Sequence, residues 1–160
     1  MRTEIFWIAG RWPGRLAISP RPRGGDWLQD EVREWHDAGV ATVVSLLTGD
    51  EIEELELSAE PSLCEAQSVE LLSLPIPDRG LPESRERFEA LVLELERRLS
   101  AGKSVLVHCR QGIGRSSMLA AALLNNAGEG VDPALARIGS ARGRPVPDTE
   151  EQRQWLHALE

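Results

Sequence analysis

The chain has 160 residues, 41% of them hydrophobic and 28% charged, and a formal net charge of −8 at pH 7. This length and composition predict one globular domain, residues 1–160, that is large enough to bury a hydrophobic core. The negative charge argues against a nucleic acid partner, and no apolar run is long enough to span a membrane.

The first third of the chain is expected to contain short strands and one helix. Strands at 4–8 and 16–18 flank a turn at 12–14, where Pro and Gly occur. Asp26 is expected to cap a helix that ends near Gly39. Its apolar positions have helical spacing: Leu28, Val32 and Trp35.

The middle of the chain continues this alternation. The near-continuous apolar run 41–47 is typical of a parallel strand buried on both faces. Thr48 and Glu51 have the spacing of a capping box that opens a helix. A short helix at 60–68 and a strand at 71–74 follow.

The second half predicts four more helices and a strand. The longest helix, 83–101, carries one apolar stripe and stops at Gly102, and the strand 105–108 follows it. The helix after Arg115 is apolar almost all round, which predicts a central, buried position. Asp132-Pro133 opens another helix, and the last runs over 149–159. Strands that alternate with helices predict an α/β/α three-layer domain with a mostly parallel sheet flanked by helices.

Residues 108–116, His-Cys-Arg-Gln-Gly-Ile-Gly-Arg-Ser, join the predicted strand 105–108 to this apolar helix. Such a turn directs backbone N–H groups and the positive end of a helix dipole at one place, which suits a tetrahedral oxyanion. The same field favours a thiolate, so we expect Cys109 to be largely ionised near neutral pH. Arg115 can place two N–H donors on phosphate oxygens. The alternative, a free core cysteine on a buried strand, leaves the glycines and the arginine unexplained.

The pattern HCx5R followed by Ser resembles the signature of the protein tyrosine phosphatase superfamily. Low-molecular-weight phosphatases and arsenate reductases carry this loop near the N-terminus, whereas here it lies two-thirds of the way along the chain. That order and the short length resemble the compact dual-specificity branch, which includes the cyclin-dependent-kinase-associated phosphatase and its small bacterial relatives. The resemblance implies a dual-specificity-phosphatase-like fold.

The resemblance also implies roles for individual residues. Cys109 is the expected nucleophile, and the general acid and base is an aspartate some thirty residues earlier, where this chain has Asp78. A turn aspartate is the alternative for Asp78, and Glu83 is the second choice as acid. Ser116 is expected to stabilise the departing thiolate, although a serine in the first turn of a helix would occupy the same place.

Three further residues have open interpretations. His108 resembles the family histidine that orders the loop, but a structural histidine at a strand end is equally consistent. Gln152 resembles a glutamine that positions the attacking water, while Thr149 with Gln152 is also a capping-box pattern. Cys64 is either a thiol that protects Cys109 as a disulfide or, as we favour, a buried structural thiol.

The expected phosphate-binding residues form the loop itself, and Arg110 beside the nucleophile also resembles a basic residue of phosphoinositide-directed relatives. A surface arginine is the alternative. The expected set is Arg110, Gln111, Gly112, Ile113, Gly114 and Arg115.

These observations predict a cysteine-dependent phosphate monoester hydrolase that acts on phosphotyrosine, and on phosphoserine and phosphothreonine, through a phosphocysteine intermediate. Its partners would be a phosphorylated protein or a small phosphate monoester, with phosphate or vanadate bound at the same site. The alternatives are a phosphoinositide or other non-protein phosphatase, a phosphate-binding pseudophosphatase and a rhodanese-type sulfur transferase, whose loop is typically shorter.

The remaining expectations concern cofactors and surroundings. No metal or organic cofactor is implied, and no spacing suggests metal ligands. Two cysteines make no disulfide framework, and the N-terminus lacks a basic-then-apolar signal pattern. We therefore expect a cytoplasmic monomer whose thiols stay reduced.

Overall fold

The computed structural model describes residues 3–160 and contains a five-stranded sheet in the order β1-β2-β5-β3-β4. β1 pairs antiparallel with β2, and all other neighbours are parallel. β5 therefore lies in the middle of the sheet, between β2 and β3. The strands are β1 (Phe6–Ile8), β2 (Leu16–Ser19), β3 (Val40–Ser45), β4 (Glu70–Ser73) and β5 (Ser104–His108).

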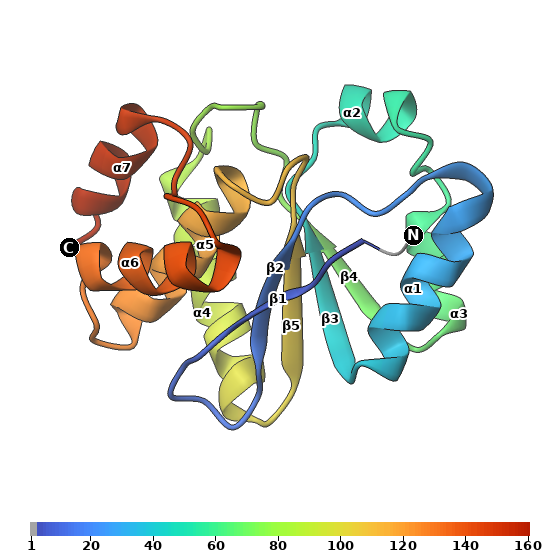
Figure 1. The fold of residues 1–160 in the computed structure, drawn as a ribbon, viewed down its shortest axis with the longest axis horizontal. Helices are drawn as coiled ribbons and strands as arrows, with labels where there is room; N and C mark the ends of the chain where they lie inside the picture. Colours follow the sequence, from blue (N-terminus) through green and yellow to red (C-terminus); the bar gives the residue numbers. More distant parts are fainter. Residues whose placement is uncertain (1–2) are drawn as a thin grey trace.

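Helices cover both faces of the sheet, which confirms the predicted three-layer α/β/α fold (Figure 1). α1 and α3 lie on one face, α4 to α7 lie on the other, and α2 lies at the end of the sheet where the parallel strands finish. The helices are α1 (Leu28–Asp37), α2 (Gly49–Glu54), α3 (Glu60–Ala66), α4 (Arg85–Ser100), α5 (Arg115–Asn126), α6 (Val131–Arg142) and α7 (Glu150–His157). Within residues 3–160, no helix is both long enough and apolar enough to cross a membrane.

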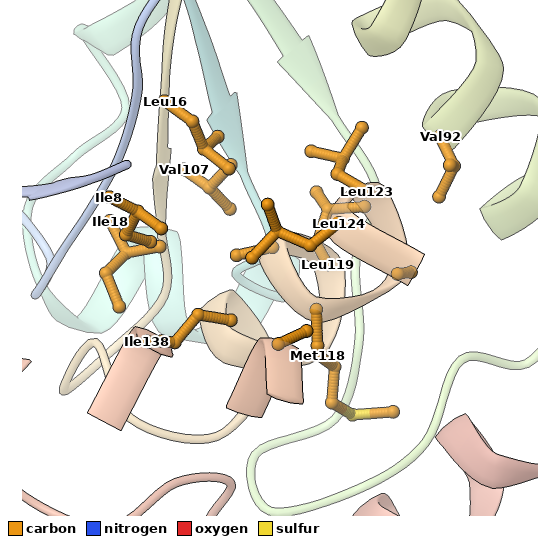
Figure 2. Packing of buried hydrophobic residues seen from close by; sticks show 14 of the residues in the cluster. Ile8, Leu16, Ile18, Val92, Val107, Met118, Leu119, Leu123, Leu124 and Ile138 are labelled. Carbon is orange, nitrogen blue, oxygen red and sulfur yellow. The ribbon is translucent and has the colours of Figure 1, made fainter. Parts of the chain in front are cut away.

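Two hydrophobic cores form because successive side chains of a strand point to opposite faces. Leu106 of β5 joins the core under α1 and α3, whereas Val105 and Val107 join the larger core under α4, α5 and α6. Figure 2 shows side chains of α5 between the strand residues and those of α4 and α6. Ten of the twelve residues of α5 are buried, which confirms its predicted central position.

Two capping boxes are confirmed. The Thr48 side chain accepts a hydrogen bond from the Glu51 amide and opens α2, and Thr149 does the same with Gln152 at α7. Such boxes satisfy N–H groups that the first turn of a helix would otherwise leave without a partner.

Three predicted helix starts are wrong. Asp26 lies in a 3₁₀ turn, Gly25–Trp27, and caps nothing, because this turn precedes α1. Glu83 was expected inside α4, but Ser84 caps that helix by accepting from the Arg87 amide. Asp132 is the second residue of α6 rather than its cap, since Gly130 with φ +82° occupies the cap position.

Several element ends also differ from the predicted ones by one to three residues. The strand expected at 4–8 is paired only over Phe6–Ile8. The helix expected at 60–68 ends at Ala66, and Ser68 has a positive φ of 58°. Differences of this size are expected, because the ends of helices fray and their boundaries vary by one or two residues with the criterion used.

Candidate active site

The loop that follows β5 lies at the carboxyl end of the parallel strands, beside α2 and the segment after β4 (Figure 1). Open α/β sheets bind ligands at this end. Cys109 is 2% exposed and lies at the pocket that this loop encloses. The pocket is lined by Asp78, Arg79, Cys109, Gln111, Ile113, Gly114, Arg115 and Asp148.

Two contacts fix the backbone of the loop. Gly112 has φ +69°, and a Cβ there would come within 2.8 Å of the backbone of Ser19 and Pro20, so only glycine fits. Arg142, the last residue of α6, donates from Nε to the Gly112 carbonyl at 3.1 Å and from Nη2 to the Gln111 carbonyl at 3.2 Å. The loop is therefore held from outside by both the strand β2 and the helix α6.

The guanidinium of Arg115 is buried at the first residue of α5 and is 2% exposed. Glu51 accepts two hydrogen bonds from it, at 2.6 Å to Nη1 and 2.9 Å to Nη2. Nη1 also donates to the carbonyls of Ile76 at 2.7 Å and Leu46 at 3.4 Å. Nη2 donates to Oδ1 of Asp78 at 3.1 Å. The bidentate pairing with Glu51 fixes the plane of the guanidinium.

The ionisation of this pair is strongly biased toward the charged state. Burial alone would raise the pKa of Glu51, but hydrogen bonds from Arg115 and Thr48 outweigh it and lower that pKa to about 2. Burial opposes the charge of Arg115, yet the hydrogen bond to Glu51 and the negative charges of Cys109, Glu51 and Asp78 raise its pKa above the ordinary value. The site therefore holds a permanent positive charge beside the cysteine.

Asp78 lies on the loop after β4 with a side chain that is 56% exposed, and it reaches the pocket of Cys109. The next residue, Arg79, has φ +58° and pairs with Asp148 across the pocket at 2.9 Å. Glu83, the second choice as acid, instead lines a separate groove with Leu74 and Pro75. Of the two carboxylates, only Asp78 borders the predicted nucleophile.

Gln152 is fully buried and links two loops of the site. Its Oε1 accepts from the amides of Asp148 and Thr149, as a capping residue does. Its Nε2 donates to the Gly80 carbonyl at 3.1 Å, on the loop that carries Asp78. A Cβ on Gly114 would lie 3.0 Å from Gln152, so the nucleophile loop passes directly against this amide. The capping interpretation holds, and the predicted contact with water stays a prediction.

Ser116 is fully buried at the second position of α5. Its hydroxyl has no hydrogen-bond partner among residues 3–160. The hydroxyl is thus available to another group, and its predicted role toward the thiolate stays a prediction.

His108 and Cys64 lie on the face of the sheet that α1 and α3 cover, and neither lines the pocket. His108 stacks on Trp35 with ring centroids 5.9 Å apart, and its Nε2 lies 2.6 Å from Oε2 of Glu60. Cys64 is buried in α3, where burial and the charge of Glu60 raise the pKa of its thiol to about 12. Cys64 and Cys109 belong to cores on opposite faces of the sheet, which favours a structural Cys64.

Arg110 is paired with acidic side chains of α2. Its Nη2 donates to Glu54 at 3.2 Å, and its Nη1 lies 3.7 Å from Glu51. Both contacts raise its pKa, the hydrogen bond to Glu54 most. A second anionic group on a substrate would therefore compete with Glu54 for this arginine.

Sequence reasoning missed three contacts at the site or beside it: Glu51 with Arg115, Arg142 with the loop, and Glu60 with His108. Glu51 was recognised only as part of a capping box. Its place just after the predicted strand 41–47 was a usable signal, because the ends of parallel strands meet at one edge of a sheet. Arg142 and Glu60 lie far from the loop in sequence, and no local pattern marks them.

A mostly parallel sheet, in which the loop between β5 and α5 carries Cys109 at one end and Arg115 at the other, resembles the architecture of the protein tyrosine phosphatases. Residues 5–160 match the family model described as the Swiss Army Knife protein, DSP-PTPase phosphatase domain (PTP-SAK). The chain belongs to this dual-specificity phosphatase family, as the sequence predicted.

The similar proteins agree with this assignment. Cyclin-dependent kinase inhibitor 3 of Rattus norvegicus is 27% identical over 132 residues, and that of Sus scrofa is 29% identical over the same length. Each alignment covers 81% of this chain, which spans 62% of the length of these relatives. These matches confirm the resemblance to the cyclin-dependent-kinase-associated branch.

Two solved structures are also similar. The structure of Tk-PTP in the active form has a TM-score of 0.79 and 31% identity, covering 98% of this chain and 95% of its own. Kinase-associated phosphatase, with serine in place of its catalytic-site cysteine, has a TM-score of 0.91 over 99% of this chain and 94% of its own. At 21% identity this second match supports the fold.

Proposed function

We propose that the chain hydrolyses phosphate monoesters through a phosphocysteine intermediate. One observation carries the proposal: Arg115 and Asp78 meet at 3.1 Å at the pocket of Cys109. A nucleophile, an anion-binding guanidinium and a proton donor are the three groups that such a reaction needs.

The proposed first step transfers the phosphoryl group to the enzyme. Arg115 and the amides of the loop 110–115 bind the phosphate dianion. The Cys109 thiolate attacks phosphorus in line, an S–P bond forms, and the bond to the leaving oxygen breaks while Asp78 donates its proton to that oxygen. Most of the acceleration comes from positioning and from stabilising the equatorial oxygens.

The proposed second step releases inorganic phosphate. The Asp78 carboxylate takes a proton from water, whose oxygen attacks phosphorus as the S–P bond breaks. The Ser116 hydroxyl, which is buried and unpaired among the described residues, donates to the departing thiolate. Gln152 borders the loop at Gly114 and orients the attacking water.

We propose phosphotyrosine together with phosphoserine and phosphothreonine as the substrate class. Membership of the dual-specificity family and the similarity to the cyclin-dependent kinase inhibitor 3 proteins support protein substrates. They do not favour the phosphoinositide alternative, although PTPMT1, solved in complex with PI(5)P, shares the fold with a TM-score of 0.76. We further propose that residues 1–160 form one phosphatase domain that acts as a cytoplasmic monomer and binds phosphate or vanadate.

Phosphate release from a substrate panel tests the proposal. Phosphotyrosine, phosphoserine and phosphothreonine peptides and short-chain phosphoinositides would be compared at equal concentration, with Cys109→Ser as the control. We expect turnover of all three peptides, fastest for phosphotyrosine because a phenolate leaves more readily. Turnover of phosphoinositides alone would replace the protein-phosphatase proposal, and no release by the wild type would reject both.

A further inference from the structure

The strand residue before the nucleophile, His108, is part of a buried polar pair that the proposed reaction does not use. His108 is 0% exposed and Glu60 is 2% exposed. Their side chains meet at 2.6 Å between Nε2 and Oε2, across the boundary between β5 and α3. A buried carboxylate is costly unless it is hydrogen-bonded, so this contact accounts for the position of Glu60.

An ionised carboxylate can only accept, so an ionised Glu60 places the ring hydrogen of His108 on Nε2. Nδ1 is also buried and has no partner among residues 3–160. The ring orientation therefore depends on Glu60 at one edge and on the stacked Trp35 on its face, with centroids 5.9 Å apart.

The main chain of His108 leads directly into the catalytic loop. Its carbonyl accepts from the Leu46 amide at 3.0 Å, and Cys109 is the next residue. The His108 ring packs against Trp35 and Glu60 on the face of the sheet that α1 and α3 cover, so a change in its orientation would act on the peptide that leads into Cys109. A side chain of α3 thus contacts the residue that directly precedes the nucleophile.

We infer that Glu60 is a positioning residue for the nucleophile: its carboxylate accepts from Nε2 of His108 and so fixes the peptide that presents Cys109. The inference rests on the proposed function, since it assigns Glu60 to the same site. Cys64 on α3 also lies near the pair, and the charge of Glu60 contributes to the raised pKa of its thiol.

The test measures the reactivity of Cys109 directly, by the rate of alkylation with iodoacetamide from pH 5 to 9, alongside kcat, KM and Tm. Cys64 is buried with a thiol pKa of about 12, and a Cys64→Ala background removes any contribution from it. Glu60→Gln keeps an oxygen that accepts from Nε2, whereas Glu60→Leu removes it. Glu65→Gln, an exposed position on α3, is the matched control.

We expect Glu60→Leu to slow alkylation and to lower kcat/KM by about tenfold, the effect of one lost buried hydrogen bond. Glu60→Gln should stay within about threefold of the wild type, and Glu65→Gln should be unchanged. If Glu60→Leu does not fold, Glu60→Asp replaces it, because its shorter side chain keeps the charge and loses the 2.6 Å contact.

Three results would overturn the inference: wild-type alkylation in a folded Glu60→Leu protein, wild-type alkylation in Glu60→Asp, or a loss in Glu60→Gln equal to that in Glu60→Leu. Alkylation needs no turnover, so these results are separate from a failure of the proposed function. An inactive wild type would reject the phosphatase proposal by itself.

Discussion

Nη2 of Arg115 donates to Oδ1 of Asp78 at 3.1 Å, so the predicted anion-binding group and the predicted acid contact each other. Arg115 is almost wholly buried, whereas the side chain of Asp78 is 56% exposed. The fixed partner is therefore the arginine, and the carboxylate is the group that is free to move. A bound phosphate would compete with Asp78 for this donor and would leave the carboxyl group available for its predicted role as the acid.

The first prediction separates binding from chemistry. Cys109→Ser should lose essentially all turnover and still bind vanadate, because the loop amides and Arg115 remain. Arg115→Ala should lose both, since it removes the buried positive charge. Isothermal titration with vanadate and phosphate-release rates measure the two properties, with the exposed Arg97→Ala as control. Turnover by Cys109→Ser within tenfold of the wild type would contradict the mechanism.

The second prediction concerns the acid. Asp78→Asn should lower kcat by roughly 10²-fold for a poor leaving group, the usual scale of general acid catalysis, and less for an activated aryl phosphate. The alkaline limb of the pH profile should flatten in this variant. Asp50→Asn on α2 is the control. Equal losses on both substrates with an unchanged profile would transfer the role to another residue, and Glu83→Gln tests that case first.

The third prediction concerns the Glu51–Arg115 pair. The pKa of Glu51 falls from 4.5 to about 2, so its contribution to stability is complete above pH 4.5 and is lost as the pH falls toward 2. Because one pKa unit corresponds to about 1.4 kcal/mol, the lowered pKa of Glu51 contributes roughly 3 kcal/mol to the free energy of unfolding. Glu51→Gln should therefore destabilise the protein at pH 7 and converge with the wild type near pH 2.

Urea unfolding at pH 7, 4 and 2.5 measures this difference. The exposed Glu53→Gln, on the same helix, is the control and should parallel the wild type throughout. A destabilisation by Glu51→Gln that does not change with pH would mean that packing, and not charge, explains the effect.

The fourth prediction concerns Arg142, whose two hydrogen bonds to carbonyls keep the adjoining peptides of the loop in place. Arg142→Ala should weaken vanadate binding by about tenfold, because the loop amides lose their fixed direction. Arg142→Lys, with one compact donor group, should keep only part of the wild-type affinity for vanadate. Arg144→Ala, two residues further, is the control. Unchanged binding in Arg142→Ala would show that the other contacts of the loop hold it without Arg142.

The fifth prediction uses the pairing of Arg110 with Glu54 at 3.2 Å. Arg110→Ala should lower kcat/KM for doubly anionic substrates by about tenfold and should change kcat/KM for simple aryl phosphates much less. Glu54→Gln should have the opposite effect, because it frees the arginine for the substrate. Ratios of kcat/KM for singly and doubly phosphorylated peptides measure both. Equal effects on all substrates would assign Arg110 to the structure of the loop.

The sequence predicted the parts of the site that depend on neighbours in the chain. The order of β5, the loop and α5 follows from the apolar runs on either side of residues 109–114, and the caps at Thr48 and Thr149 follow from three-residue spacings. The catalytic assignments of Asp78, Ser116 and Gln152 remain predictions, because they concern a bound substrate.

Contacts between distant residues could not be predicted in this way. Glu60 is 48 residues from His108, and Arg142 is 30 residues from Gly112. A buried glutamate at the start of a short helix and an arginine at the end of another resemble surface residues in the sequence. Only the packing of α3 against β4 and α1, and of α6 against β1 and α5, brings Glu60 to His108 and Arg142 to the loop.

The central position of β5 implies unequal local stability within the site. Its amides are hydrogen-bonded to β2 and β3 and covered on both faces, so they should exchange with deuterium only when the whole molecule unfolds. The segment that carries Asp78 is partly exposed and is held mainly by side-chain hydrogen bonds, those of Arg115, Arg79 and Gln152. It should open and close many times within the lifetime of the folded protein, which lets substrates enter without disturbing the nucleophile.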